Sequence, residues 1–143
     1  MGWLPLKWMG DGGWGMESRD TKPSLDRLDL RDETRNYALR IMRLFSSLPK
    51  NTLAQTLGRQ VLRSGTSVGA HYREACRAKS NADFVSKIEG ALQELDETLY
   101  WIELLEAGEI VPKSKLSKLC TDSERLIGIF VSMTKKVKSI PKK

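Results

Sequence analysis

The sequence has few of the residues from which proteins build metal centres and disulfide frameworks. Its 143 residues include a single histidine, His71, and two cysteines, Cys76 and Cys120. Structural zinc sites need four Cys or His ligands, and disulfide-stapled domains need several cysteine pairs. We therefore expect no metal site and no cofactor, and we expect both cysteines to be reduced, buried structural residues.

Catalytic motifs and long apolar runs are also missing. The chain has no phosphate-binding glycine loop, no nucleophile with a histidine-based constellation, and no Glu-x-x-His pair of the kind that di-iron bundles require. His71 is expected to be a hydrogen-bonded residue at the edge of a helix, so we predict no catalytic residue and no enzyme. No stretch reaches the roughly 18 apolar residues of a membrane helix, and no signal-peptide core is present. These absences favour a cytoplasmic protein.

From residue 25 onward the apolar residues recur with a helical period. Proline and glycine divide this region into four amphipathic helices at about 31–48, 52–78, 81–107 and 114–138. Ser80 resembles a helix N-cap, and Gly108 suits the C′ position. Helices with such short connections predict an all-α fold, an antiparallel up-down-up-down four-helix bundle over residues 25–140. Gly65 and Gly69, four residues apart, predict a close helix crossing or a mild bend.

The first 24 residues follow neither a helical nor a strand period. They hold Trp3, Trp8 and Trp14 among five glycines, and they predict a poorly ordered tail. Three interpretations stay open. Translation can begin downstream at Met9 or Met16, the tryptophans can dock onto a partner, or the tail can be an inert extension.

Charge is distributed unevenly along the chain. Lys and Arg number 24 against 18 Asp and Glu, giving a net charge of +6. The acidic segment 80–112 stands among three basic segments, and a row of arginines is expected along the second helix, opposite its apolar face. Such a row can follow a nucleic-acid backbone, or it can pair with the acidic helix of a neighbouring subunit. The candidate nucleic-acid-binding residues are Arg59, Arg63, Arg73, Arg77, Lys135, Lys136 and Lys138. For the three lysines, interaction with the helix dipole is the simpler alternative.

A second set of large apolar residues lies outside the predicted core faces. This arrangement indicates a partner surface, with self-association as the leading use and a different protein or the N-terminal tail as alternatives. The candidate oligomer-interface residues are Leu39, Met42, Tyr100, Trp101 and Leu104.

Two stretches resemble a known family. The run from Arg59 to Phe84, RQVLRSGTSVGAHYREACRAKSNADF, and the run from Glu94 to Leu105, ELDETLYWIELL, are similar to the small bacterial four-helix-bundle proteins first noticed in intervening sequences of 23S ribosomal RNA genes. The resemblance covers about residues 31–138. His71 stands where that family is expected to have asparagine, and the Trp-rich tail lies outside its pattern.

The resemblance implies a homopentamer of antiparallel bundles without known catalytic activity. A more distant resemblance is to the accessory protein of diversity-generating retroelements, a basic pentamer that binds nucleic acid and a reverse transcriptase. The leading hypothesis is therefore a non-enzymatic homo-oligomer whose basic surface contacts RNA or DNA phosphates. The alternative is a protein-interaction scaffold or accessory subunit, for example of a reverse transcriptase, in which the arginines serve subunit contacts.

Overall fold

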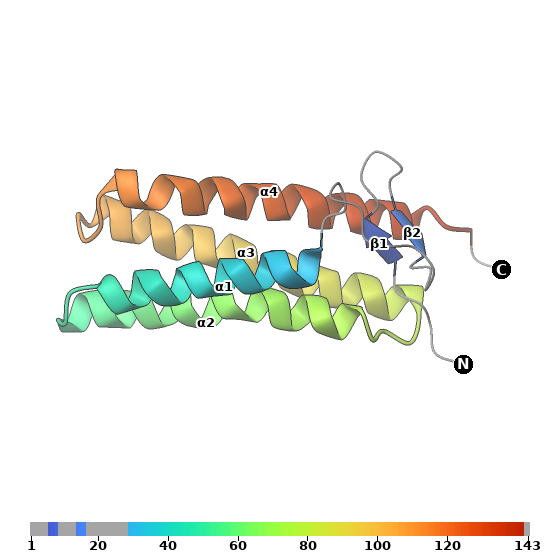
Figure 1. Ribbon diagram of the computed structural model, residues 1–143, viewed down its shortest axis with the longest axis horizontal. Coiled ribbons are helices and arrows are strands. Elements are labelled where there is room, and N and C mark those ends of the chain that lie inside the picture. The colour runs from blue at the N-terminus through green and yellow to red at the C-terminus, as the bar shows by residue number, and fades with distance from the viewer. Residues whose placement is uncertain (1–5, 9–13, 17–28, 142–143) are drawn as a thin grey trace.

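Four long helices form the body of the molecule, as predicted (Figure 1). The computed structural model describes residues 6–8, 14–16 and 29–141. The elements are β1 (Leu6–Trp8), β2 (Trp14–Met16), α1 (Leu30–Ser47), α2 (Thr52–Ala75), α3 (Asn81–Ala107) and α4 (Lys113–Lys138). The fold class is all-α.

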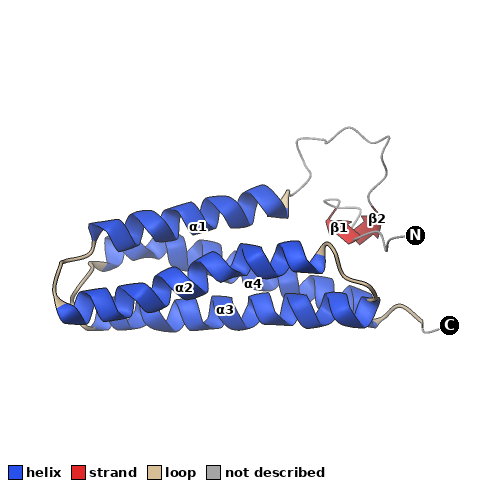
Figure 2. Cartoon of the chain, turned by 90° about the horizontal axis from the view of Figure 1, so that it is seen from below, coloured by secondary structure: helices blue, strands red, loops and turns tan. Residues whose placement is uncertain are grey.

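Each helix runs antiparallel to the next, and α2 packs against both α1 and α3. The contact between α1 and α4 is sparser and includes the ion pairs Arg40–Asp122 and Glu33–Arg125. Figure 2 shows α1 and α3 on opposite sides, with α2 and α4 between them. The outer faces of α1 and α3 therefore point in opposite directions.

Local sequence sets the helix ends. The side chains of Asp29, Asn51 and Ser80 cap the first turns of α1, α2 and α3 by accepting hydrogen bonds from backbone N–H groups. One boundary and one cap differ from the prediction. Helix α2 ends at Ala75, three residues early, and Gly108 is the C-cap of α3 with a negative φ. The left-handed residue is Glu109, at φ 58°, because the Gly108 N–H still bonds to Leu104.

The core consists of the predicted apolar stripes. Ile41, Val61, Leu95 and Phe130 are almost completely buried, one on each helix. Leu53, which the pattern of the second helix also places on the apolar face, is instead 61% exposed. It lies in the first turn of α2, where Ala54 takes the inward position.

Glycines let α1 lie unusually close to α2, so the predicted close crossing is confirmed. A methyl group on Gly65 would come within 2.9 Å of three atoms of the Ile41 side chain, and one on Gly69 would lie 3.1 Å from the Thr34 hydroxyl. Gly58 faces Phe45 and Leu48 in the same way. Successive glycines of α2 thus face successively earlier residues of α1.

Four buried hydroxyl groups, one from each helix, form a polar layer across the core. We call Tyr37, Ser64, Thr98 and Ser123 the hydroxyl layer. The Tyr37 and Ser123 oxygens are 2.6 Å apart, and those of Thr98 and Ser64 are 2.7 Å apart. Ser123 donates to the Leu119 carbonyl, so Tyr37 is the donor to Ser123. Burial raises the pKa of Tyr37 to about 12, against the smaller, opposite effect of the Ser123 and Thr98 hydroxyls.

Two short strands precede the bundle. β1 and β2 pair antiparallel, with Leu6 opposite Met16 and Trp8 opposite Trp14. The sequence pattern predicted no strand, and this expectation is wrong at these six residues. Cross-strand pairs of large apolar residues favour such a pairing. The rest of the predicted tail, residues 1–5, 9–13 and 17–24, lies outside the described residues.

We expect alanine to have opposite effects at two helical glycines. Alanine normally stabilises a helix interior by about 1 kcal/mol relative to glycine. At Gly128, where no atom lies within 4 Å of the added methyl, Gly128→Ala should show this gain. Gly65→Ala should instead destabilise by about 1–2 kcal/mol, since buried Ile41 must move. Urea denaturation of both variants checks the signs, and a stabilising Gly65→Ala would contradict the close crossing.

Tyr37 should make the fold sensitive to alkaline pH. Its pKa is near 10 when unfolded and about 12 when folded. The stability that its neutral form provides is therefore complete below pH 10 and is lost as pH rises from 10 to 12. We expect Tyr37→Phe to be less stable than the parent at pH 8, through loss of the bond to Ser123, but to lose less stability between pH 10 and 12. Denaturant titrations at three pH values measure this, and parallel pH curves would refute it.

Candidate nucleic-acid interface

The predicted arginine row is divided into two pairs. Arg59, Arg63 and Arg73 are exposed on α2, which the glycines do not interrupt. Arg77 is exposed too, but it follows the end of the helix, so the angular argument does not apply to it. Ten residues separate Arg63 from Arg73, about 15 Å along the helix.

The acidic helix of the same chain neutralises the middle of this row. Arg63 bonds to Glu97 at 2.6 Å and to Glu94 at 3.3 Å, both on α3. Glu97 raises the pKa of the Arg63 guanidinium above its usual value. The sequence pattern left phosphate or a neighbouring subunit as partners for the row, whereas Arg63 has its partners within the chain. The signal was the acidic run of the third helix, but the pairing depends on how α2 and α3 align.

Several of the remaining cations gather at one end of the bundle, whereas Lys113, Lys115 and Lys118 lie at the other end, where α4 begins. The C-termini of α2 and α4 lie at the same end, on the right in Figure 1. Among the described residues, no ion pair involves these exposed cations, which we call the basic end: Arg73, Arg77, Lys79, Lys135 and Lys136. Lys79 was missed by the sequence analysis because it lies in the connection between α2 and α3. Lys138 is at the same end but bonds to Glu89 at 2.9 Å.

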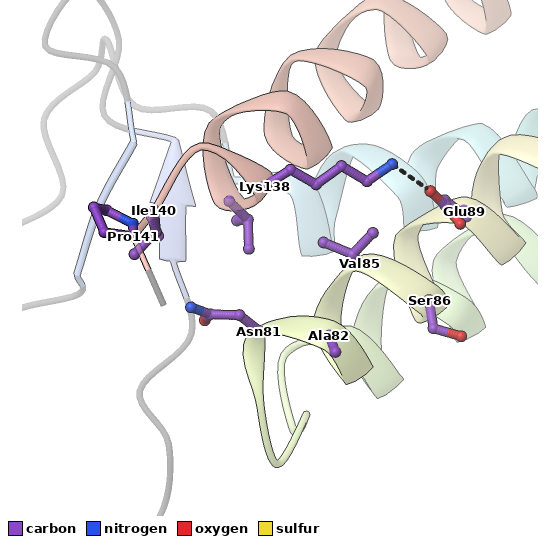
Figure 3. A pocket seen from close by; sticks show the side chains of 9 residues that line it. Asn81, Ala82, Val85, Ser86, Glu89, Lys138, Ile140 and Pro141 are labelled. Atoms are coloured by element: carbon purple, nitrogen blue, oxygen red, sulfur yellow. Dashed lines mark hydrogen bonds and ion pairs between the residues drawn. The ribbon is translucent and has the colours of Figure 1, made fainter. Parts of the chain in front are cut away.

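A groove of about 930 Å³ opens beside the basic end, between the start of α3 and the end of α4. Figure 3 shows Val85 on its α3 wall, Ile140 and Pro141 on its α4 side, and the Lys138–Glu89 ion pair joining the two helices. The wall is mainly apolar. One paired cation and one paired carboxylate do not form an acid–base site of their own.

The residues best suited to acid–base or nucleophilic chemistry lie on different helices. His71 is 31% exposed at the edge of α2, with Nδ1 3.8 Å from Glu74 and against Gly90. The expected hydrogen bond is missing, because Nδ1 is buried without a partner among the described residues. Burial, with the carboxylates Glu106 and Glu124, raises the pKa of the half-buried Cys120. Within residues 29–141, no group of three His, Cys, Asp or Glu side chains could hold a metal ion.

The five apolar residues predicted to form one oligomer interface lie on two separate surfaces of the bundle. Leu39 and Met42 are 36% and 47% exposed on α1, beside a shallow depression of about 420 Å³. Tyr100, Trp101 and Leu104 belong to α3, on the opposite side of the bundle. Tyr100 is 53% exposed, whereas Trp101 and Leu104 are half-buried and Trp101 packs against the core. The Tyr100 and Trp101 rings are 5.1 Å apart.

None of the helices among the described residues is sufficiently long and apolar to cross a membrane. A comparison with proteins of curated function gave no match. Among solved structures, the chain is similar to a protein of unknown function from the S23 ribosomal protein family of Bacteroides thetaiotaomicron. The two are 37% identical with a TM-score of 0.70, and the similarity covers 74% of this chain and 98% of that one.

Residues 26–132 match the family described as 23S rRNA-intervening sequence protein. The matched region holds most of the bundle, including both arginine pairs, and leaves out the two strands and the final lysines. The chain therefore belongs to the 23S rRNA-intervening sequence protein family.

Proposed function

We propose that this protein is a non-enzymatic, ring-forming homo-oligomer that binds the phosphate backbone of RNA or DNA through its basic end. The main support for this proposal is that five exposed cations lie at one end of the bundle. They come from α2, α4 and the α2–α3 connection, and none forms an ion pair with a described residue. Phosphate binding requires such available charge, because each neutralised phosphate releases counterions. Base-specific recognition is no part of the proposal.

Ion pairing narrows the candidate residues. Arg63 is held by two carboxylates of α3, and Lys138 is held by Glu89. A phosphate would have to compete with these pairs, whereas it meets Arg73, Arg77, Lys135 and Lys136 without competition from described residues. Arg63 and Lys138 therefore have a minor role, and Arg73 and Arg77 with Lys135 and Lys136 have the major one.

The apolar surfaces support a closed ring. A two-fold dimer joins one surface to its own copy, but a ring joins two different surfaces head to tail. Here the surfaces lie on helices at opposite sides of the bundle, and one holds a depression while the other presents the Tyr100 ring. The homopentamer implied by the family resemblance is such a ring.

A protein-interaction scaffold is the second candidate, and the depression on α1 favours it. An accessory subunit of a reverse transcriptase would be one form of it. The basic end then serves solubility, and the outer faces of α1 and α3 accept a different protein.

Reversing charge at the basic end should abolish nucleic-acid binding. We expect Arg73→Glu/Arg77→Glu to weaken binding to structured RNA and duplex DNA by about tenfold or more near 0.1 M salt, and to flatten its salt dependence. Fluorescence anisotropy of nuclease-treated protein, titrated at low and physiological salt, measures both effects.

The matched control is Arg59→Glu/Arg63→Glu, which makes the same charge change nearer the start of α2. It should lose the Arg63 pairs to α3 yet bind nucleic acid nearly as the parent does. If the basic-end variant keeps its helical content and native mass and still binds as tightly as the parent, the basic end is not the binding surface.

Charge on either outer face should break the ring. Tyr100→Glu and Met42→Glu are better probes than Trp101→Glu, because their side chains do not stabilise the protomer core. We expect each to reduce the native mass to that of a protomer, because burying a charge in an apolar contact is costly. Leu53→Glu changes an exposed leucine at the start of α2 and should leave the mass unchanged.

Mixing the two interface variants separates a ring from a two-fold dimer. A Tyr100→Glu protomer keeps its α1 face, and a Met42→Glu protomer keeps its α3 face. One intact contact can then form between them, so the mixture should give a heterodimer and no larger assembly. A mass that responds to only one of the two substitutions would refute the head-to-tail arrangement.

A further inference from the structure

Helix α1 is too short to cover its neighbours. Gly65 of α2 faces Ile41, and Gly69 faces Thr34, so the first residue of α1, Leu30, lies level with the C-terminal end of α2. Helix α2 ends there too, at Ala75. At the end of the bundle that carries the basic end, α3 and α4 extend well past the start of α1 (Figure 1).

Residues at this end are nevertheless buried. On α3, Lys87 lies level with Glu74 of α2, so Phe84 lies near or just past the level at which α1 begins. Phe84 is 0% exposed, and Ala75 and Ala78 are 0% and 3% exposed. The apolar core thus stays closed to water at the end of the bundle where α1 stops.

The position of the strand pair and the alternation of its residues both fit the end of the bundle beyond α1. In both Figure 1 and Figure 2, β1 and β2 lie beyond the first residue of α1, at the end that α1 leaves uncovered. Strand residues alternate between faces, and directly paired residues share a face. The observed register therefore puts Leu6, Trp8, Trp14 and Met16 together and leaves Lys7 and Gly15 for the other face.

We propose that the β1–β2 hairpin is a docking element that replaces the missing turns of α1 and closes the core over Phe84. A lone two-stranded hairpin is at best marginally stable in water, so an entirely apolar face requires a partner surface. Thirteen residues, 17–29, join β2 to α1 and can span up to about 43 Å, so the bundle of the same chain is within reach. This tether gives intrachain docking a high effective concentration over docking onto another copy. The hairpin and its tether up to residue 25 precede the family match.

The first test compares the two faces of the hairpin in the full chain. We expect Trp8→Ser/Trp14→Ser to lower Tm by about 5 °C or more, since two large apolar groups lose their contact with the core. Lys7→Ser, on the opposite face of the same strand, and Trp3→Ser, outside both strands, are the controls and should shift Tm by less than about 2 °C. Equal Tm values for all the variants would overturn the proposal.

A second measurement does not depend on stability. In a Trp3→Phe/Trp101→Phe chain only Trp8 and Trp14 fluoresce, and we expect their emission to be blue-shifted and poorly quenched by acrylamide. Dilution should not change this protection, because the contact lies within one chain. Quenching equal to that of free tryptophan would overturn docking, and protection that vanishes on dilution would overturn its intrachain form.

Discussion

The hydroxyl layer fixes how the four helices align along the bundle. Apolar stripes alone tolerate sliding by a turn, because one leucine can replace another in the same position. Ser64, Thr98 and Ser123 also bond to carbonyl groups of their own helices, but the Tyr37 hydroxyl has its partner on α4. A buried hydroxyl without a partner costs about 1–3 kcal/mol, so sliding α1 past α4 would leave the Tyr37 donor unsatisfied. Tyr37 and Ser123 align α1 with α4, and Ser64 and Thr98 align α2 with α3. That alignment sets which residues of different helices share an end of the molecule.

Two structural features at one end of the bundle follow from this alignment. The C-termini of α2 and α4 are level, so cations distant in sequence lie at one end, and the start of α1 falls short of that end. Helix dipoles alone would favour Lys135, Lys136 and Arg73 in the last turns of their helices. Arg77 and Lys79 lie beyond the last turn of α2, where the dipole effect fades. The proposed phosphate binding would account for their position.

Sequence patterns predicted the helices well because a period of 3.6 residues is a local property. Contacts between helices were harder to predict. The pairing of Arg63 with Glu94 and Glu97 depends on the alignment of α2 and α3, and no local pattern encodes it. The hydroxyl layer left a readable signal, since Ser64, Thr98 and Ser123 are polar residues within apolar stripes. The hairpin left one too, in the alternation of Leu6, Lys7 and Trp8 and in the Asp11-Gly12 pair between the strands, a dipeptide that favours tight turns.

Assembly into a ring would decide which basic residues act together. If α1 of one protomer meets α3 of the next, these two helices point along the circumference, and α2 and α4 point toward the inside and the outside of the ring. Along the length of the bundle, the arginines of α2 and the lysines of α4 are then separated by the thickness of the wall. They come together only on the end face, where the helices stop. Each added protomer extends that face by another basic end, so the ring multiplies the charge cluster that pairing with α3 has left available, and a nucleic-acid backbone would lie across the end of the ring instead of along α2.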